Sequence, residues 1–124
     1  MKEGKLSLGI DFDGTIVEHE FPKIGKAKKG AIKAIQALDK AGFKIVINTV
    51  RSNRQVNPDC DKLIQDMEDW LKENKVPYDE VWRGEGKPFC HIFLDDSAIP
   101  FTDWAQALTV LITLLKKGND VKSV

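Results

Sequence analysis

The sequence predicts a single α/β domain in which a Rossmann-like parallel sheet of about four or five strands carries helices on both faces. Two observations lead to this fold class. Short apolar runs alternate along the chain with longer segments whose apolar residues recur at helical spacing. Strands that alternate with helices favour a parallel sheet, because a helix returns the chain to the edge from which the next strand starts. The 124 residues suit one compact domain, 1–124, and leave little for a second.

The predicted strands are short apolar runs that stop abruptly at polar residues, which favours buried strands over helices. They are Leu6–Ile10, Phe43–Thr49, Tyr78–Arg83 and Phe89–Leu94. The segment Thr15–Ile24 mixes β-branched residues with His19, Glu20 and Pro22. We expect it to form an irregular hairpin, or flap, beside the end of the first strand.

Two helices are predicted between the strands. Ala27–Ala41 has apolar residues at helical spacing, and Gly42 stands where a C-cap glycine belongs. Asn57 is expected to cap the next helix, with Pro58 in its first turn, where a missing N–H costs nothing. That helix is expected to stop before Pro77.

The third predicted helix closes the chain. Asp103 is expected to cap it, with Gln106 completing a capping box, and Gly118 to end it. Its main apolar stripe is widened by Ala107, Val110 and Leu114. A wide apolar surface of this kind indicates a contact between copies of the chain.

Composition narrows the class of protein. The 19 basic and 19 acidic residues cancel, which argues against nucleic acid as a partner. No apolar run reaches the roughly 20 residues needed to span a bilayer, and Met1–Lys5 lacks the apolar core of a signal peptide. The two cysteines, Cys60 and Cys90, form no disulfide framework. We therefore expect a cytoplasmic protein without a membrane partner.

Polar residues stand at the predicted carboxyl ends of the strands. Asp11-Phe12-Asp13-Gly14-Thr15 follows the first strand, Thr49 ends the second, and Asp95-Asp96 follows the fourth, with Lys87 in the loop before it. Ligands of parallel sheets bind beyond these ends. The sequence thus predicts one site to which all these residues contribute.

These residue types suit phosphoryl transfer. An aspartate can attack phosphorus and form an aspartyl-phosphate, and a cation must then reduce the repulsion between carboxylate and phosphate. Mg²⁺ prefers oxygen ligands, and Asp11 and Asp95 are the candidates. Lys87 would offset further negative charge, and the Thr49 hydroxyl would donate to a phosphoryl oxygen.

The spacing D-x-D places a second carboxyl beside the first, because residues i and i+2 of an extended segment point to the same side. Asp13 would then protonate the leaving oxygen and later deprotonate the attacking water. Gly14 would let the backbone turn sharply next to a ligand.

With these residues in view, the chain resembles the haloacid dehalogenase (HAD) superfamily of phosphatases. The first motif of that family, D-x-D-G-T, is matched by Asp11–Thr15, the second by Thr49, the third by Lys87 and the fourth by Asp95-Asp96. The motifs stand in family order and span residues 6 to 96.

The resemblance implies a magnesium-dependent phosphohydrolase acting on a phosphomonoester. Asp11 would be the nucleophile, Asp13 the acid and base, and Thr49 and Lys87 would complete the catalytic set. Mg²⁺ would be held by Asp11, the Asp13 backbone carbonyl, Asp95 and Asp96. The gaps between motifs leave no room for a cap domain, so the chain looks like a capless member, similar to hydrolases associated with capsular or surface polysaccharide biosynthesis.

The same subfamily carries T-x-R at the second motif, matched here by Thr49-Val50-Arg51. Together with Gly14 and Thr15, Val50 and Arg51 are expected to contact the substrate. Arg51 would clamp a phosphate or carboxylate with its planar fork, and surface solvation is the equal alternative. The expected substrate is a phosphorylated small molecule such as a sugar phosphate.

Other interpretations stay open at this point. A phosphotransferase or mutase would use the same aspartyl-phosphate and a different acceptor. A phospho-accepting signalling module also uses Asp, Thr and Lys side chains, although in another order along the chain. Each residue has a purely structural interpretation as well, as a turn, a cap, a strand end or a surface charge.

Overall fold

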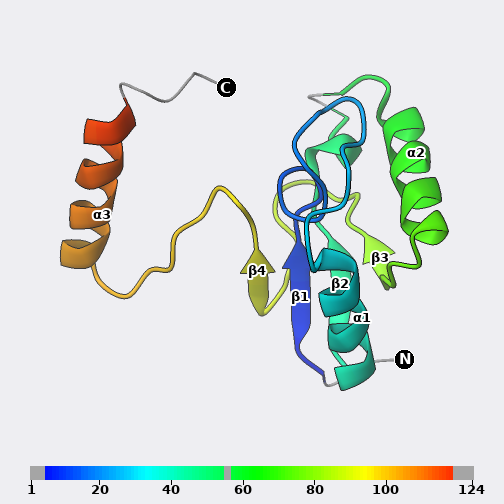
Figure 1. The fold of residues 1–124 in the computed structure, drawn as a ribbon, viewed down its shortest axis with the longest axis horizontal. Coiled ribbons are helices and arrows are strands. Elements are labelled where there is room, and N and C mark those ends of the chain that lie inside the picture. The colour runs from blue at the N-terminus through cyan, green and yellow to red at the C-terminus, as the bar shows by residue number, and fades with distance from the viewer. Residues whose placement is uncertain (1–4, 55–56, 119–124) are drawn as a thin grey trace.

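The computed structural model of the protein describes residues 5–54 and 57–118. Residues 1–4, 55–56 and 119–124 lie outside the described part, and so does most of the Met1–Lys5 segment considered above. Three helices and a sheet follow one another in the order β1, α1, β2, α2, β3, β4, α3 (Figure 1). A short 3₁₀ helix, η1 (Val50–Ser52), follows β2.

The sheet has four parallel strands in the order β3-β2-β1-β4. They are β1 (Ser7–Ile10), β2 (Lys44–Ile47), β3 (Glu80–Val81) and β4 (Ile92–Leu94). The predicted α/β class with a parallel Rossmann-like sheet is therefore confirmed. Each strand is shorter than predicted, although flanking residues such as Asn48 and Trp82 still donate backbone hydrogen bonds to the neighbouring strand.

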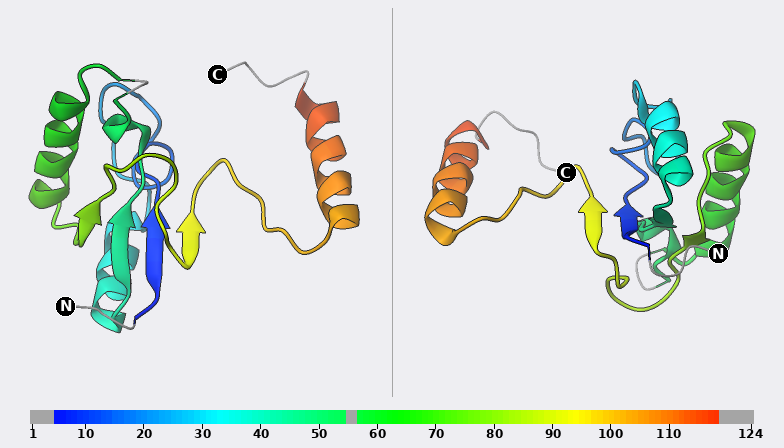
Figure 2. Two further views of the ribbon diagram at one scale, coloured as in Figure 1. Left: turned by 180° about the vertical axis from the view of Figure 1, so that it is seen from behind. Right: turned by 90° about the horizontal axis from the view of Figure 1, so that it is seen from below.

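One face of the sheet carries both α1 (Ala31–Ala41) and α2 (Cys60–Glu73). Alternate strand residues point to this face, where they form a single buried cluster with both helices: Leu8, Ile10, Ile35, Ile45, Ile47, Met67 and Leu71. The two crossovers run in the same direction across the sheet, and right-handed connections then place both helices on one side. The expectation of helices on both faces is wrong for the described residues, because α3 does not pack on the opposite face (Figures 1 and 2).

The predicted start of α1 at Ala27 is also wrong, and the flap explains why. Ala27 forms an antiparallel bridge with Val17, and the Lys28 N–H donates to the Ile16 carbonyl at 2.9 Å. This pairing is the irregular hairpin expected beside β1, and it keeps residues 26–28 extended. The helix begins after Gly30, whose φ of 84° is left-handed.

Some of the capping residues expected from the sequence are found at the helix ends, and one is not. Gly42 caps α1 in the left-handed conformation, with its N–H directed at the carbonyls of Leu38 and Asp39, as predicted. Asn57 does not cap α2, which begins at Cys60 after Asp59. The Asn57 side chain instead donates to the Val50 carbonyl and so fastens the loop after β2.

The last helix, α3 (Trp104–Lys117), stands apart from the sheet (Figure 1). Its predicted cap is confirmed, since the Asp103 carboxylate accepts from the Gln106 N–H at 2.8 Å. The segment from Asp95 to Asp103 extends away from β4 and leads the chain to this helix (Figure 2). Among the described residues, no helix combines the length and apolar character that crossing a membrane requires.

Candidate active site

Three carboxylates meet at the carboxyl ends of β1 and β4. The Asp11 N–H donates to the Leu94 carbonyl at 3.0 Å, which fixes the end of β1 against the end of β4. Asp11, Asp95 and Asp96 each offer one oxygen atom, and these atoms lie within 4.8 Å of one another. The structure thus brings together the first and fourth sequence motifs, as the strand-end pattern predicted.

The crowding of these carboxylates changes the chemistry of Asp11. Partial burial and then the negative charge of Asp95 raise the pKa of Asp11 from 3.8 to about 7. The hydrogen bond that Thr15 Oγ1 donates to Asp11 Oδ2 at 3.2 Å opposes this rise, and Asp96 adds to it. The site therefore holds more negative charge than the surrounding protein neutralises.

Gly14 is the residue that allows Asp96 to approach. Its φ is 93°, in the left-handed region. A Cβ atom at this position would lie 2.3 Å from Asp96 Oδ2, closer than any real contact. The glycine of D-x-D-G-T thus makes room for a carboxylate of the fourth motif, in addition to turning the backbone.

Asp13 lies behind this cluster in a buried ion pair with Arg51. Arg51 Nε donates to Asp13 Oδ2 and Arg51 Nη2 to Asp13 Oδ1, both at 2.8 Å. The Arg51 side chain is 0% exposed and that of Asp13 is 7% exposed. Both oxygens of Asp13 are thus occupied by a bidentate guanidinium, the strongest form of such a pair.

Arg51 also fastens the flap. Its Nη1 donates to the Pro22 carbonyl at 3.2 Å and its Nη2 to the Lys23 carbonyl at 3.0 Å. The guanidinium carbon lies 5.3 Å from the centre of the Phe12 ring and 5.1 Å from that of Phe21. The expectation that Arg51 clamps a substrate needs correction, because in this structure the guanidinium is buried and its donors are taken by the protein.

Thr49 and Val50 occupy the positions expected of the second motif. Thr49 caps η1, and its Oγ1 accepts from the Arg51 N–H at 3.2 Å. The hydroxyl proton of Thr49 is not used in that bond. Thr49 and the exposed Val50 line the same cavity as Asp11 and Asp95, so this part of the site faces the space a substrate would enter.

Lys87 does not join the acidic cluster in this structure. Its ammonium lies 4.1 Å from the centre of the Phe93 ring. Phe93 pairs with Gly9, and both face the side of the sheet opposite to the Leu8 and Ile10 core. The charges that shift the pKa of Asp11 come from Asp95 and Asp96 and do not include Lys87.

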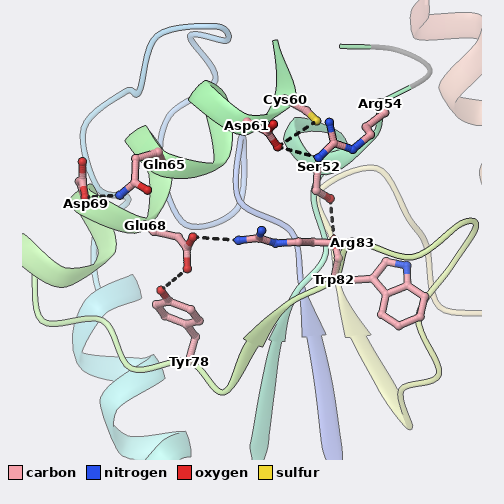
Figure 3. Close-up of polar contacts among 10 residues, drawn as sticks. All are labelled: Ser52, Arg54, Cys60, Asp61, Gln65, Glu68, Asp69, Tyr78, Trp82 and Arg83. Carbon is pink, nitrogen blue, oxygen red and sulfur yellow. Dashed lines mark hydrogen bonds and ion pairs between the residues drawn. The ribbon is translucent and has the colours of Figure 1, made fainter. Parts of the chain in front are cut away.

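A cavity of about 650 Å³ opens in front of Asp11 and Asp95. Its far wall is made by the loop after β3, which includes Trp82 and Arg83. Figure 3 shows how this wall is held: Ser52 Oγ donates to the Trp82 carbonyl at 2.6 Å, and Arg83 Nη2 donates to Glu68 at 3.1 Å. Glu68 in turn accepts from the Tyr78 hydroxyl at 2.7 Å (Figure 3).

The sequence predicts only part of this lining. The loop that begins at Arg54 was expected to border the site, and Arg54 lines the cavity in an exposed ion pair with Asp61. Arg83, which pairs with the partly buried Glu68, was not expected there. Its position at the end of a predicted strand was a usable signal.

Comparisons with known proteins support the fold alone. No protein-family model matches the chain, and no curated protein matches it. Among solved structures, the chain is similar to a conserved protein coded by a locus of Bacteroides thetaiotaomicron, with a TM-score of 0.62 and 21% identity. The similarity covers 98% of this chain and 100% of the other, so the two share the same overall extent.

Proposed function

We propose that the protein is a magnesium-dependent phosphohydrolase that acts on phosphomonoesters through Asp11. The convergence of Asp11, Asp95 and Asp96 beside a cavity that Asp11 and Asp95 line carries this proposal. Three clustered carboxylates repel one another without a cation, and the charges of Asp95 and Asp96 add to the burial that raises the pKa of Asp11. The order of the motifs along the chain, which resembles that of the HAD phosphatases, supports the same chemistry.

The donor set fits Mg²⁺. All three side chains offer carboxylate oxygens, and Asp95 and Asp96 are exposed, which leaves room for the waters that Mg²⁺ retains. When bound, the ion would supply positive charge that screens the nucleophile from the phosphate it attacks. Soft ligands are missing from this cluster, because the described cysteines Cys60 and Cys90 lie elsewhere in the fold.

The residues around the cluster suit an attack by Asp11. Thr15 holds Asp11 Oδ2 by a hydrogen bond and so orients the carboxylate. One Asp11 oxygen would form a bond to phosphorus while the bond to the leaving oxygen breaks, and the Thr49 hydroxyl would donate to a phosphoryl oxygen. Water would then attack the aspartyl-phosphate, which releases inorganic phosphate and restores Asp11.

The role of Asp13 as acid and base requires a rearrangement. Both of its oxygens accept from Arg51, and Asp13 does not line the cavity, so its carboxylate would have to turn from the ion pair to reach a leaving group. The Pro22 and Lys23 carbonyls share the same guanidinium. A movement that frees Asp13 would therefore also loosen the flap from Arg51.

The cavity supports a small phosphorylated substrate. Its volume of about 650 Å³ lies within the range of small-molecule sites. Arg54 and Arg83 line it together with the exposed Val50. A sugar phosphate is compatible with this lining, in which Arg54 and Arg83 stand beside the acidic Asp11, Asp95 and Glu85.

The test is phosphate release from an aryl phosphate in the presence of Mg²⁺. We expect activity that chelation of Mg²⁺ removes and that Asp11→Asn abolishes. Asp66→Asn is the matched control, because Asp66 lies in an exposed ion pair with Lys62 on α2. Activity that survives Asp11→Asn, or that needs no divalent ion, would exclude the mechanism.

A further inference from the structure

The last helix, α3, carries a broad apolar arc that no other described element covers. On a helical projection the arc spans more than half of the circumference and is made by Trp104, Ala107, Leu108, Val110, Leu111, Ile112, Leu114 and Leu115. Trp104 is 77% exposed, Leu108 58% and Leu115 75%. Between Trp104 and Leu115 the helix has no charged residue. A water-facing helix would not have this composition.

The sheet has a matching vacancy along its edge strand. Ile92 and Leu94 of β4 pair in register with Leu8 and Ile10 of β1, so their side chains point to the face that carries α1 and α2. Leu8 and Ile10 are 4% and 1% exposed, whereas Ile92 and Leu94 are each 42% exposed. The two helices therefore cover β1 to β3 and leave the same face of β4 open.

We propose that α3 of each copy packs on the β4 face of a second copy of this chain, in a reciprocal exchange that forms a two-fold dimer. Every copy carries both the helix and the vacancy, so two copies satisfy each other without another partner. The exchange uses none of the acidic residues of the candidate active site, and its test does not require activity.

The connection between β4 and α3 favours exchange over docking on the same copy. It runs from Asp95 to Asp103 and leads α3 away from β4 in all views (Figures 1 and 2). Pro100 restricts Ile99 to extended conformations and so disfavours the tight reversal that a return to the chain's own sheet needs. Among the described residues, the hydrogen bonds of this connection are local, such as the one that the Ser97 N–H donates to Asp95 Oδ1 at 2.7 Å.

The apolar area available is what a stable dimer needs. The exposed parts of Phe101, Trp104 and the arc leucines and isoleucine offer roughly 500 Å² of apolar surface per copy. Docking covers a comparable area of the receiving copy, with the half-exposed Ile92 and Leu94 as its apolar centre, so two reciprocal contacts bury on the order of 1,000 Å² of total surface per copy. Stable interfaces of standard size bury about 800 Å² per partner.

The first experiment measures molar mass by light scattering during gel filtration. We expect the full chain to have twice its monomer mass of 13.9 kDa. Leu111→Lys should raise the dimer dissociation constant on the order of 100-fold, because each symmetric copy loses one buried leucine and buries a charge. Thr113→Lys is the matched control: it adds the same charge to the same helix about 200° away, on the polar side, and should leave the dimer intact.

The second experiment separates exchange from a closed monomer. Ile92→Asp damages the receiving surface and leaves α3 intact, whereas Leu111→Lys does the reverse. Each variant alone should be monomeric, and an equimolar mixture should recover the dimer mass, because one intact helix then meets one intact β4 face. Circular dichroism of each variant verifies that it is folded.

Four results would overturn the exchange. A wild-type chain that stays monomeric at high concentration has docked α3 on its own sheet. A dimer that tolerates Leu111→Lys uses another surface. A monomer that co-sediments with neutral phosphatidylcholine vesicles, and loses this property with Leu111→Lys, uses α3 to bind lipid. Failure of the mixture to recover the dimer mass would likewise refute reciprocal docking.

Discussion

Replacing Arg51 with methionine should destabilise the protein severely. The guanidinium is 0% exposed and donates to both oxygens of Asp13 at 2.8 Å. Arg51→Met keeps an unbranched apolar stem but leaves the Asp13 carboxylate buried without its partner. Breaking a buried ion pair in this way costs about 3–5 kcal/mol. The Pro22 and Lys23 carbonyls lose donors as well.

This loss is a large part of the total stability, because the free energy of unfolding of domains of this size is about 5–15 kcal/mol. Each kcal/mol of destabilisation lowers the Tm by roughly 3–5 °C at this chain length. We therefore expect the Tm of Arg51→Met to fall by about 10–20 °C. Urea denaturation followed by circular dichroism gives the free energy of unfolding directly.

Two further variants identify the cause. Arg54→Met is the matched control, because Arg54 pairs with Asp61 in an ion pair whose side chains are 70% and 74% exposed, and exposed pairs contribute little. The double variant Arg51→Met with Asp13→Leu removes both charges and should regain much of the stability that Arg51→Met loses. A loss below about 1 kcal/mol in Arg51→Met, or a double variant as unstable as the sum of both changes, would refute the reasoning.

Four more outcomes follow from the structure. Because the pKa of Asp11 is raised to about 7, Mg²⁺ must displace a proton from Asp11 when it binds at lower pH. The apparent affinity for Mg²⁺ should therefore rise roughly tenfold per pH unit below pH 7 and level off above it. Calorimetry that shows no proton release would contradict this. Without Mg²⁺, the stability that the neutral Asp11 contributes is present near pH 3.8 and is lost as pH rises through about 7, which thermal denaturation across that range measures. Burial and the hydrogen bond to Glu68 raise the pKa of Tyr78 to about 12. Since Tyr78 is the single tyrosine of the chain, phenolate absorbance reports this pKa directly. Glu68→Gln should lower the pKa of Tyr78, and an unchanged titration midpoint would count against the contact. Gly14→Ala should weaken Mg²⁺ binding by pushing the Asp96 carboxylate aside, and calorimetry showing unchanged affinity would disprove that role of the glycine.

The strands and most helix ends could be predicted because their causes are local. The apolar runs of β1 and β2 stop at polar residues. Gly42 ends α1 in a left-handed conformation that its missing Cβ permits, and the Asp103 side chain caps α3. The start of α1 could not be predicted in the same way. Ala27 pairs with Val17 across the flap, and a pairing between distant residues overrides the helical spacing of the segment that contains it.

In the candidate site, too, some features could be predicted from the sequence and others could not. Asp11, Asp95 and Asp96 meet because parallel strands present their carboxyl ends at one edge, and that rule needs only the strand assignment. The surroundings of Arg51 and Lys87 depend on which way the neighbouring chain turns. Phe12 and Phe21 enclose Arg51, and Phe93 holds the Lys87 ammonium on the other side of the sheet. The spacing of the motifs along the sequence does not determine in which direction the Arg51 and Lys87 side chains point.

The ion pair between Asp13 and Arg51 links stability to the proposed chemistry. The same guanidinium that holds Asp13 also bonds the flap through the Pro22 and Lys23 carbonyls. Both oxygens of Asp13 accept from this guanidinium, and Asp13 is not among the residues that line the cavity in front of Asp11. Catalysis by Asp13 therefore requires at least one of these bonds to open, and a substrate that draws the carboxylate toward the cavity would have to compensate for the cost. The flap and the acid are thus expected to move together, since one side chain restrains both.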